Sequence, residues 1–162
     1  EGGCFGYHWY TSRSPDERLE GLIIVTAVFN NYVDEILDFH QVSSSRCVLV
    51  GFSQGSMLSL HLAPRRLKPL GGVVAFSGAM MTLNTLRDEI INKTPICFIA
   101  GREDTDIPPE RSHDASSLLT ELDVPNELHI LDNLGHSING QGLGIAEKFI
   151  LHVLLDPKGS IT

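Results

Sequence analysis

The sequence predicts an α/β fold, with a parallel sheet flanked by helices, formed by residues 1–162 as a single domain. Two observations predict this fold. Short apolar runs alternate along the chain with segments of helical spacing, which is the order of elements in a parallel sheet. The run at residues 47–50 has no polar residue, as is typical of a strand buried on both faces.

The elements follow from local patterns. Ser14 and Pro15 suit the N-cap and first position of a helix, which apolar spacing extends to about Phe39. Beyond the strand at 47–50, further apolar runs predict three more strands, and the fourth alternates as an edge strand would. These strands are expected at residues 71–78, 96–100 and 126–131. Helical spacing and proline breaks predict helices at residues 56–61, 82–92, 108–122 and 145–155.

Composition excludes several classes of protein. Twelve Lys and Arg against twenty Asp and Glu give a net charge of −8, and no basic cluster is present, so neither nucleic acid nor an anionic membrane is an expected partner. No apolar run reaches transmembrane length, so no stable membrane anchor is expected. Cys4, Cys47 and Cys97 are odd in number and far apart, and two of them lie in apolar strands, which favours buried thiols in a reducing, cytoplasmic compartment over a disulfide framework or a metal site.

The segment Gly51-Phe52-Ser53-Gln54-Gly55 lies between a predicted strand and a predicted helix. Gly-x-Ser-x-Gly in this context predicts a nucleophile elbow, a tight turn that exposes the hydroxyl of Ser53. The turn would leave the backbone N–H of Gln54 free to bind an oxyanion. We expect glycine at 51 and 55 because a Cβ atom would collide with neighbouring backbone. A strand–helix turn with an incidental serine is the alternative interpretation.

Partners for a nucleophilic serine follow the next strands. Catalytic groups collect at the carboxyl ends of parallel strands, where Glu103, Asp104 and Asp106 follow the third strand and His136 follows the fourth. A serine needs a base near neutrality, and an imidazole needs an acid to fix its tautomer. The pattern leaves the choice among the three acids open. An ordinary loop histidine is the alternative for His136.

No metal and no cofactor is expected. The histidines other than His136 are scattered over the entry segment, helices and the fourth strand, and they form no evident metal-ligand cluster in the sequence. They are His8, His40, His61, His113, His129 and His152.

These motifs together resemble the phospholipase/carboxylesterase family of α/β-hydrolases, which includes acyl-protein thioesterases and small bacterial carboxylesterases. Residues 51–55 resemble its Gly-Phe-Ser-Gln-Gly elbow, and residues 101–108 resemble its Gly-x-x-Asp-x-x-Val-Pro motif with Ile107 in place of valine. Residues 75–78 are similar to its Ala-x-Ser-Gly strand end, and residues 135–136 to its Gly-His. The resemblance extends from about Tyr7 to the last helix.

The resemblance implies an α/β-hydrolase fold and a serine hydrolase of short- to medium-chain acyl esters or thioesters. It implies that Ser53 is the nucleophile, His136 the base and Asp104 the acid, with the N–H of Gln54 in the oxyanion hole. Tyr7, Trp9 and Tyr10, in the glycine- and aromatic-rich segment 1–13, are expected to border the substrate pocket, although a satellite core under a loop fits them equally well.

The amino-terminal side departs from the family pattern. The family's earlier strands, and the His-Gly loop that supplies a second oxyanion donor, have no counterpart in the sequence. A sheet that began at residue 47 would also expose an apolar edge. We therefore expect the chain to be about two thirds of a longer enzyme, its carboxyl-terminal part.

Two alternatives remain open at this point. The first is a non-catalytic or incomplete fragment that needs an N-terminal segment, a partner chain or a second copy in a homodimer. The second is a dienelactone-hydrolase-like or peptidase α/β-hydrolase. Dienelactone hydrolases resemble this pattern less closely because they carry cysteine at the elbow.

Overall fold

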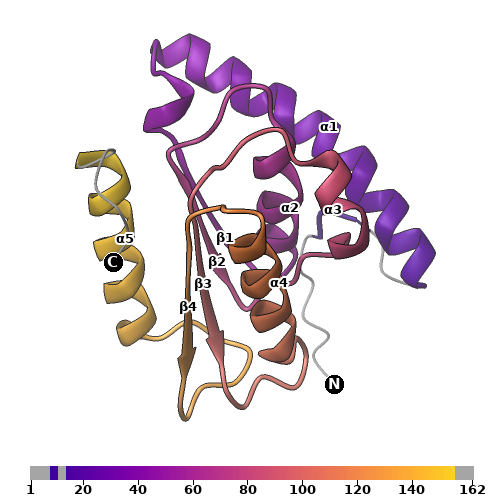
Figure 1. The fold of residues 1–162 in the computed structure, drawn as a ribbon, viewed down its shortest axis with the longest axis vertical. Coiled ribbons are helices and arrows are strands. Elements are labelled where there is room, and N and C mark those ends of the chain that lie inside the picture. The colour runs from indigo at the N-terminus through magenta and orange to yellow at the C-terminus, as the bar shows by residue number, and fades with distance from the viewer. Residues whose placement is uncertain (1–7, 11–13, 156–162) are drawn as a thin grey trace, which may run out of the picture.

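A computed structural model describes residues 8–10 and 14–155. Cys4 and Tyr7, and the expectations attached to them, lie outside the described residues. The described part forms a four-stranded parallel sheet with the strands in chain order, β1-β2-β3-β4 (Figure 1). The strands are β1 (Val48–Phe52), β2 (Gly72–Phe76), β3 (Ile96–Gly101) and β4 (Asn126–Leu131). All four predicted strands are thus confirmed.

Helices cover both faces of this sheet, because parallel strands need crossover connections. α5 lies on one face against β2 and β3, whereas α2 and α4 pack on the other, with α1 outside α2 (Figure 1). The helices are α1 (Pro15–His40), α2 (Gln54–Leu62), α3 (Leu83–Glu89), α4 (Glu110–Glu121) and α5 (Gly140–Leu155), with short 3₁₀ turns η1 (Ser44–Arg46) and η2 (Ala63–Arg65). Within the described ranges, no helix is both long enough and apolar enough to cross a membrane.

α1 begins where its capping residues predict. The hydroxyl of Ser14 accepts a hydrogen bond from the N–H of Glu17 at 3.2 Å, which satisfies one of the free amides of the first turn. The helix ends at His40, and Gln41 takes the left-handed conformation that closes many helices. Both predicted boundaries are therefore confirmed to within one residue.

α5 begins at Gly140, five residues before the predicted start. The side chain of Asn139 accepts a hydrogen bond from the N–H of Gly142 at 2.8 Å, so Asn139 caps the helix. Gly142 also packs against the sheet, where a Cβ atom would come within 3.2 Å of Phe76. Glycine has a poor helix propensity, so tertiary packing extends this helix beyond the part that its sequence favours.

The sheet has two apolar layers, one on each face. The residues of β2 and β3 are all buried. β1 differs, because the side chains of Val50 and Phe52 are 56% and 39% exposed, and no described strand pairs with its outer side. The expected apolar edge is confirmed, and β1 is not buried on both faces within the described residues.

Candidate active site

Ser53 lies at the tight turn between β1 and α2. Its backbone has φ 52° and ψ −115°, a conformation that non-glycine residues rarely adopt and that other contacts must hold in place. Its N–H donates to the carbonyl of Phe76 on β2 at 3.0 Å, and its carbonyl accepts from the N–H of Met57 on α2 at 3.0 Å. This geometry is that of a nucleophile elbow.

The two glycines of the motif differ in the space that a side chain would have. A Cβ atom on Gly51 would lie 2.4 Å from the carbonyl carbon of Gly55, so glycine is required there. A Cβ atom on Gly55 would have, among the described residues, only Trp9 Nε1 within 4 Å, at 3.8 Å. The prediction is confirmed for Gly51 and wrong for Gly55, which faces Trp9 instead of backbone.

A serine outside the predicted motifs fixes the elbow from inside. Ser56 is buried, and its hydroxyl lies 2.7 Å from the carbonyls of both Gly51 and Phe76. Gly78 leaves room for it, since a Cβ atom at 78 would lie 2.2 Å from that of Ser56. Ser56 therefore ties the ends of β1 and β2 to the first turn of α2.

Asp104 and His136 meet at the carboxyl edge of the sheet, in the loops after β3 and β4. The carboxylate of Asp104 has no exposed surface, and its Oδ2 lies 2.9 Å from Nδ1 of His136. Its Oδ1 accepts hydrogen bonds from the N–H groups of Asp106 and Ile107 at 3.0 and 2.8 Å. The carboxylate is thus aimed at one ring nitrogen of the histidine.

The hydrogen bonds keep this carboxyl group ionised. Burial alone would raise the pKa of Asp104, but the Ile107 N–H and the His136 side chain more than offset burial and leave the pKa below its ordinary value of 3.8. An ionised Asp104 can hold a proton on Nδ1 of His136. The other nitrogen, Nε2, is then free to act as a base.

The other two acids of the loop occupy different positions. The carboxylate of Glu103 accepts hydrogen bonds from the N–H groups of Asn133 and Leu134 at 3.1 and 2.6 Å, which holds the loop that carries His136. Asp106 is exposed and uses its N–H, not its carboxylate, in this network. Of the three acids that the sequence left open, Asp104 is the one that contacts His136.

Ser53 and His136 lie on adjoining parts of this edge. The ring of Phe52, the residue before Ser53, packs against the imidazole with centroids 4.8 Å apart. Between these two described residues, Ser53 and His136, no hydrogen bond is formed. Catalytic hydrogen bonds are often long or absent before substrate binds, so the missing hydrogen bond does not exclude a serine–histidine pair.

A pocket of about 370 Å³ opens beside Ser53. The side chain of Gln54 holds the segment that forms one wall of the pocket. Oε1 of Gln54 accepts a hydrogen bond from the N–H of Trp9 at 3.1 Å, and Nε2 of Gln54 donates to the carbonyl of Tyr10 at 3.3 Å. The backbone N–H of Gln54 is at the start of α2, where amides have no acceptor within the helix. The pocket is lined by His8, Trp9, Phe52, Ser53, Gln54 and Gly55.

Trp9 and Tyr10 differ in position. Trp9 is half exposed and lines the pocket beside Ser53. Tyr10 is 6% exposed, packs with Leu22 and Leu58, and its hydroxyl lies 3.3 Å from the sulfur of Met57, so its side chain belongs to the core. His8 and Phe52 also line the pocket, and no pattern in the sequence distinguishes them from ordinary loop and strand residues.

The chain matches a known protein family over nearly all of its described residues. The family model for phospholipase/carboxylesterase matches residues 7–154. The chain belongs to the phospholipase/carboxylesterase family. The predicted resemblance and the predicted α/β-hydrolase fold are thereby confirmed.

Members of this family include both curated and structurally solved relatives. Acyl-protein thioesterase 1 of Gibberella zeae is 29% identical over 148 residues, which are 88% of this chain and 62% of the relative. The crystal structure of esterase PE8 is 32% identical with a TM-score of 0.87, over 93% of this chain and 72% of that one. The crystal structure of Arabidopsis thaliana SOBER1 is 26% identical with a TM-score of 0.72, over 87% of this chain and 66% of that one. The chain thus spans about 62% of the length of the curated Gibberella zeae relative.

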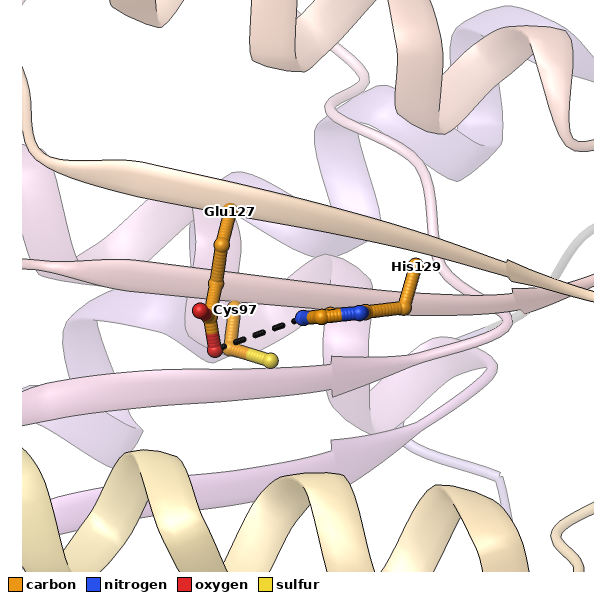
Figure 2. Close-up of side chains that lie close together, drawn as sticks. All are labelled: Cys97, Glu127 and His129. Carbon is orange, nitrogen blue, oxygen red and sulfur yellow. Dashed lines mark ion pairs between the residues drawn. The ribbon is translucent and has the colours of Figure 1, made fainter. Parts of the chain in front are cut away.

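This phospholipase/carboxylesterase chain also contains a group of metal-ligand residues away from the elbow. Cys97, Glu127 and His129 bring one possible ligand atom each to within 4.8 Å of one another (Figure 2). The sequence shows no metal-ligand cluster around His129. Cys97 and Glu127 come close to His129 only through strand pairing, which local sequence does not reveal.

Proposed function

We propose that the protein is a serine hydrolase that cleaves carboxylic esters or thioesters of short- to medium-chain acids with Ser53, His136 and Asp104. The observation that carries the proposal is the hydrogen bond between buried Asp104 and His136, at the same edge as the strained Ser53. Membership of the phospholipase/carboxylesterase family supports the reaction class. The names of the relatives, an acyl-protein thioesterase and an esterase, support both kinds of acyl bond.

In the first half of the reaction, the oxygen of Ser53 attacks the acyl carbonyl while Nε2 of His136 takes the hydroxyl proton. Asp104 keeps the proton on Nδ1 and stabilises the imidazolium that forms. The carbonyl oxygen becomes an oxyanion, which the N–H of Gln54 binds. When the tetrahedral intermediate collapses, His136 returns the proton to the departing alcohol or thiol, and an acyl group remains on Ser53.

In the second half, water replaces the alcohol. His136 removes a proton from water, the resulting hydroxide attacks the acyl-serine, and the oxyanion again forms at the N–H of Gln54. Collapse of this intermediate releases the carboxylic acid and returns the proton to Ser53. Each half uses the same three side chains, so loss of one of them stops both halves.

The size of the pocket suits a small acyl or alcohol group of the substrate. Its volume of about 370 Å³ is near the lower limit of ligand sites, which run from about 300 to 1,000 Å³. Trp9 and Phe52 supply apolar walls, and Gly55 leaves space below Trp9. We propose that Trp9 contacts the substrate, and that replacing it by alanine changes the preference among acyl chain lengths.

Ser53→Ala tests the assignment. We expect kcat/KM for p-nitrophenyl esters of two- to eight-carbon acids to fall by about 10⁴ or more, because the nucleophile is lost. Ser117→Ala is a matched control, since Ser117 is an exposed serine on α4. A fluorophosphonate should add one mass increment to the wild type and to Ser117→Ala but not to Ser53→Ala. Retention of most activity in Ser53→Ala would contradict the proposal.

The edge of the sheet supports a second proposal, which concerns what the active unit contains. Because β1 exposes apolar Val50 and Phe52 and has no outer partner among the described strands, the active unit is proposed to include further strands, from the same protein or from a partner. Those strands would bring a second oxyanion donor. If the chain alone hydrolyses esters with full activity, this requirement for a partner is refuted.

We also propose a cytoplasmic location. Cys47 and Cys97 are free thiols, and Cys97 is fully buried, which is the usual state of cysteines in a reducing compartment. The proposed reaction at Ser53 does not depend on the cellular location.

A further inference from the structure

Strand pairing brings together three possible metal ligands on the α5 side of the sheet. Cys97 on β3 is paired in register with Glu127 on β4, and His129 follows two residues later. Alternate residues of a strand point to the same face, so Glu127 and His129 share a face. The side chain of Cys97 belongs to the apolar layer under α5, which identifies that face. Figure 2 shows the three side chains pointing toward a common point.

The spacing suits a small tetrahedral cation. Oε1 of Glu127 and Nε2 of His129 are 3.5 Å apart, and two ligands bound to zinc at about 2.1 Å stand about 3.4 Å apart at the tetrahedral angle. The three residues each offer one ligand atom within 4.8 Å of the others, and a zinc–sulfur bond of about 2.3 Å would place the sulfur about 3.6 Å from the other ligand atoms. Binding of zinc would therefore require the side chains to move slightly closer together.

One polar atom in the group forms no hydrogen bond. Nε2 of His129 is buried and has no hydrogen-bond partner among the described residues, and Oε1 of Glu127, 3.5 Å away, can pair with it only when the imidazole is protonated (Figure 2). A buried nitrogen without a hydrogen bond is costly, and a cation between the two side chains would satisfy its lone pair. The exposed part of the ring and the side chain of Glu127, which is 29% exposed, provide access from solvent.

The donor set and its charge favour zinc. Thiolate, imidazole and carboxylate are a combination that zinc accepts, whereas magnesium and calcium prefer oxygen alone. One thiolate and one carboxylate balance the two charges of the ion, so the half-buried site becomes neutral. On binding, the S–H bond of Cys97 breaks, a zinc–sulfur bond forms, and the proton leaves to solvent.

We propose that Cys97, Glu127 and His129 bind one Zn²⁺, with water as the fourth ligand, and that this ion fastens the edge strand β4 to β3. The ion takes no part in the chemistry of Ser53. Cys97 lies four residues before Gly101 at the carboxyl end of β3, about 13 Å along the strand, so the ion does not reach Ser53. The ion instead holds the strand that leads to the loop of His136.

Zinc titration of the full chain tests the proposal. The purified protein is stripped with a chelator, and Zn²⁺ is then added in competition with a chromogenic chelator. We expect one Zn²⁺ per chain. We expect Cys97→Ala to abolish binding and the isosteric Glu127→Gln to weaken it by at least about tenfold. Co²⁺ in place of zinc should give a thiolate-to-cobalt absorption band in the wild type that Cys97→Ala lacks.

A matched variant separates the site from general thiol binding. Cys47→Ala removes the other described thiol, at the start of β1, and should retain both the zinc stoichiometry and the cobalt band. Circular dichroism establishes that each variant is folded. The proposal is overturned if the folded wild type binds no Zn²⁺ saturably, or if Cys97→Ala and Glu127→Gln bind it as the wild type does. These measurements do not involve esterase activity. Failure of the zinc proposal is therefore distinguishable from failure of the proposed esterase function.

Discussion

Asp104 and Asp106 are two positions apart in one loop and have opposite environments. The carboxylate of Asp104 is buried and accepts hydrogen bonds from two backbone amides and from His136. The side chain of Asp106 is exposed. A residue type alone therefore does not identify the acid, and the network around the carboxylate does.

This contrast yields a prediction about activity. Asp104→Asn should lower kcat for ester hydrolysis by on the order of 10⁴, because an amide cannot hold the required tautomer of His136. Asp106→Asn, the matched control, should stay within a few-fold of the wild type. The two variants are compared by steady-state kinetics on one p-nitrophenyl ester. Equal losses in both variants would refute the assignment of Asp104.

His61 gives a prediction about stability and pH. It is buried on α2, and burial, with a further contribution from the charge of Arg65, lowers the pKa of His61 from 6.5 to about 4, although Glu89 acts in the opposite direction. As pH falls from 6.5 to about 4, the unfolded chain binds a proton that the folded chain does not. The associated stability is therefore complete above pH 6.5 and is lost toward pH 4.

The measurement is urea unfolding at several pH values. The wild type should lose up to about 3 kcal/mol of unfolding free energy from this group between pH 6.5 and 4. His61→Gln should lack that part of the pH dependence. His113→Gln, at an exposed position on α4, should keep it. Parallel pH profiles for the wild type and His61→Gln would contradict the prediction.

At the scale of elements, the turn from β1 to α2 depends on how closely the strand approaches the helix. The carbonyl of Gly55 lies where a side chain on Gly51 would begin, whereas Gly55 itself faces the open space under Trp9. Both glycines belong to one motif, and only the first is required for packing.

Gly51→Ala and Gly55→Ala should therefore have different effects on the free energy of unfolding. Gly51→Ala should destabilise the fold by about 3 kcal/mol or more, because overpacking here meets backbone and not a movable side chain. Gly55→Ala should leave stability unchanged or raise it by up to about 1 kcal/mol, since alanine favours a helix. Denaturant unfolding of both variants checks this. Similar destabilisation by both would show that the glycines act alike.

At the scale of the whole molecule, β1 has an outer side with which no described strand pairs, and it also carries exposed apolar side chains. Val50 and Phe52 are exposed on this strand, which leads into Ser53. An edge strand with exposed apolar side chains tends to pair with another chain.

We expect the chain by itself to associate through this edge. Val50→Lys should shift the mass measured by size-exclusion chromatography with light scattering toward the monomer, since a charge on an edge strand opposes pairing. Leu67→Lys is the control, because Leu67 is a 93% exposed apolar residue in the connection before β2 and not in a strand. A monomeric wild type, or equal effects of both substitutions, would refute the prediction.

Much of the fold and the candidate site was predictable from local sequence. Apolar runs and caps predicted the four strands and most helices, since those patterns depend on neighbouring residues alone. The elbow of Ser53 and the order of serine, acid and histidine were predictable for the same reason. Where packing overrides propensity, as at the glycine-rich start of α5, the prediction was wrong by five residues.

The sequence by itself determined the strands, the elbow and the family motifs, whereas tertiary structure decided which side chains meet. Only the pairing of β3 with β4 sets Cys97 beside Glu127, 30 residues away in the chain. The family motif implied Asp104 as the acid, and the loop network shows that Asp104, and not Asp106, contacts His136. Tyr10 is buried and Trp9 lines the pocket although both are aromatic neighbours. The physical reason is that these contacts join residues distant in sequence, and local patterns carry no information on which distant surfaces pack together.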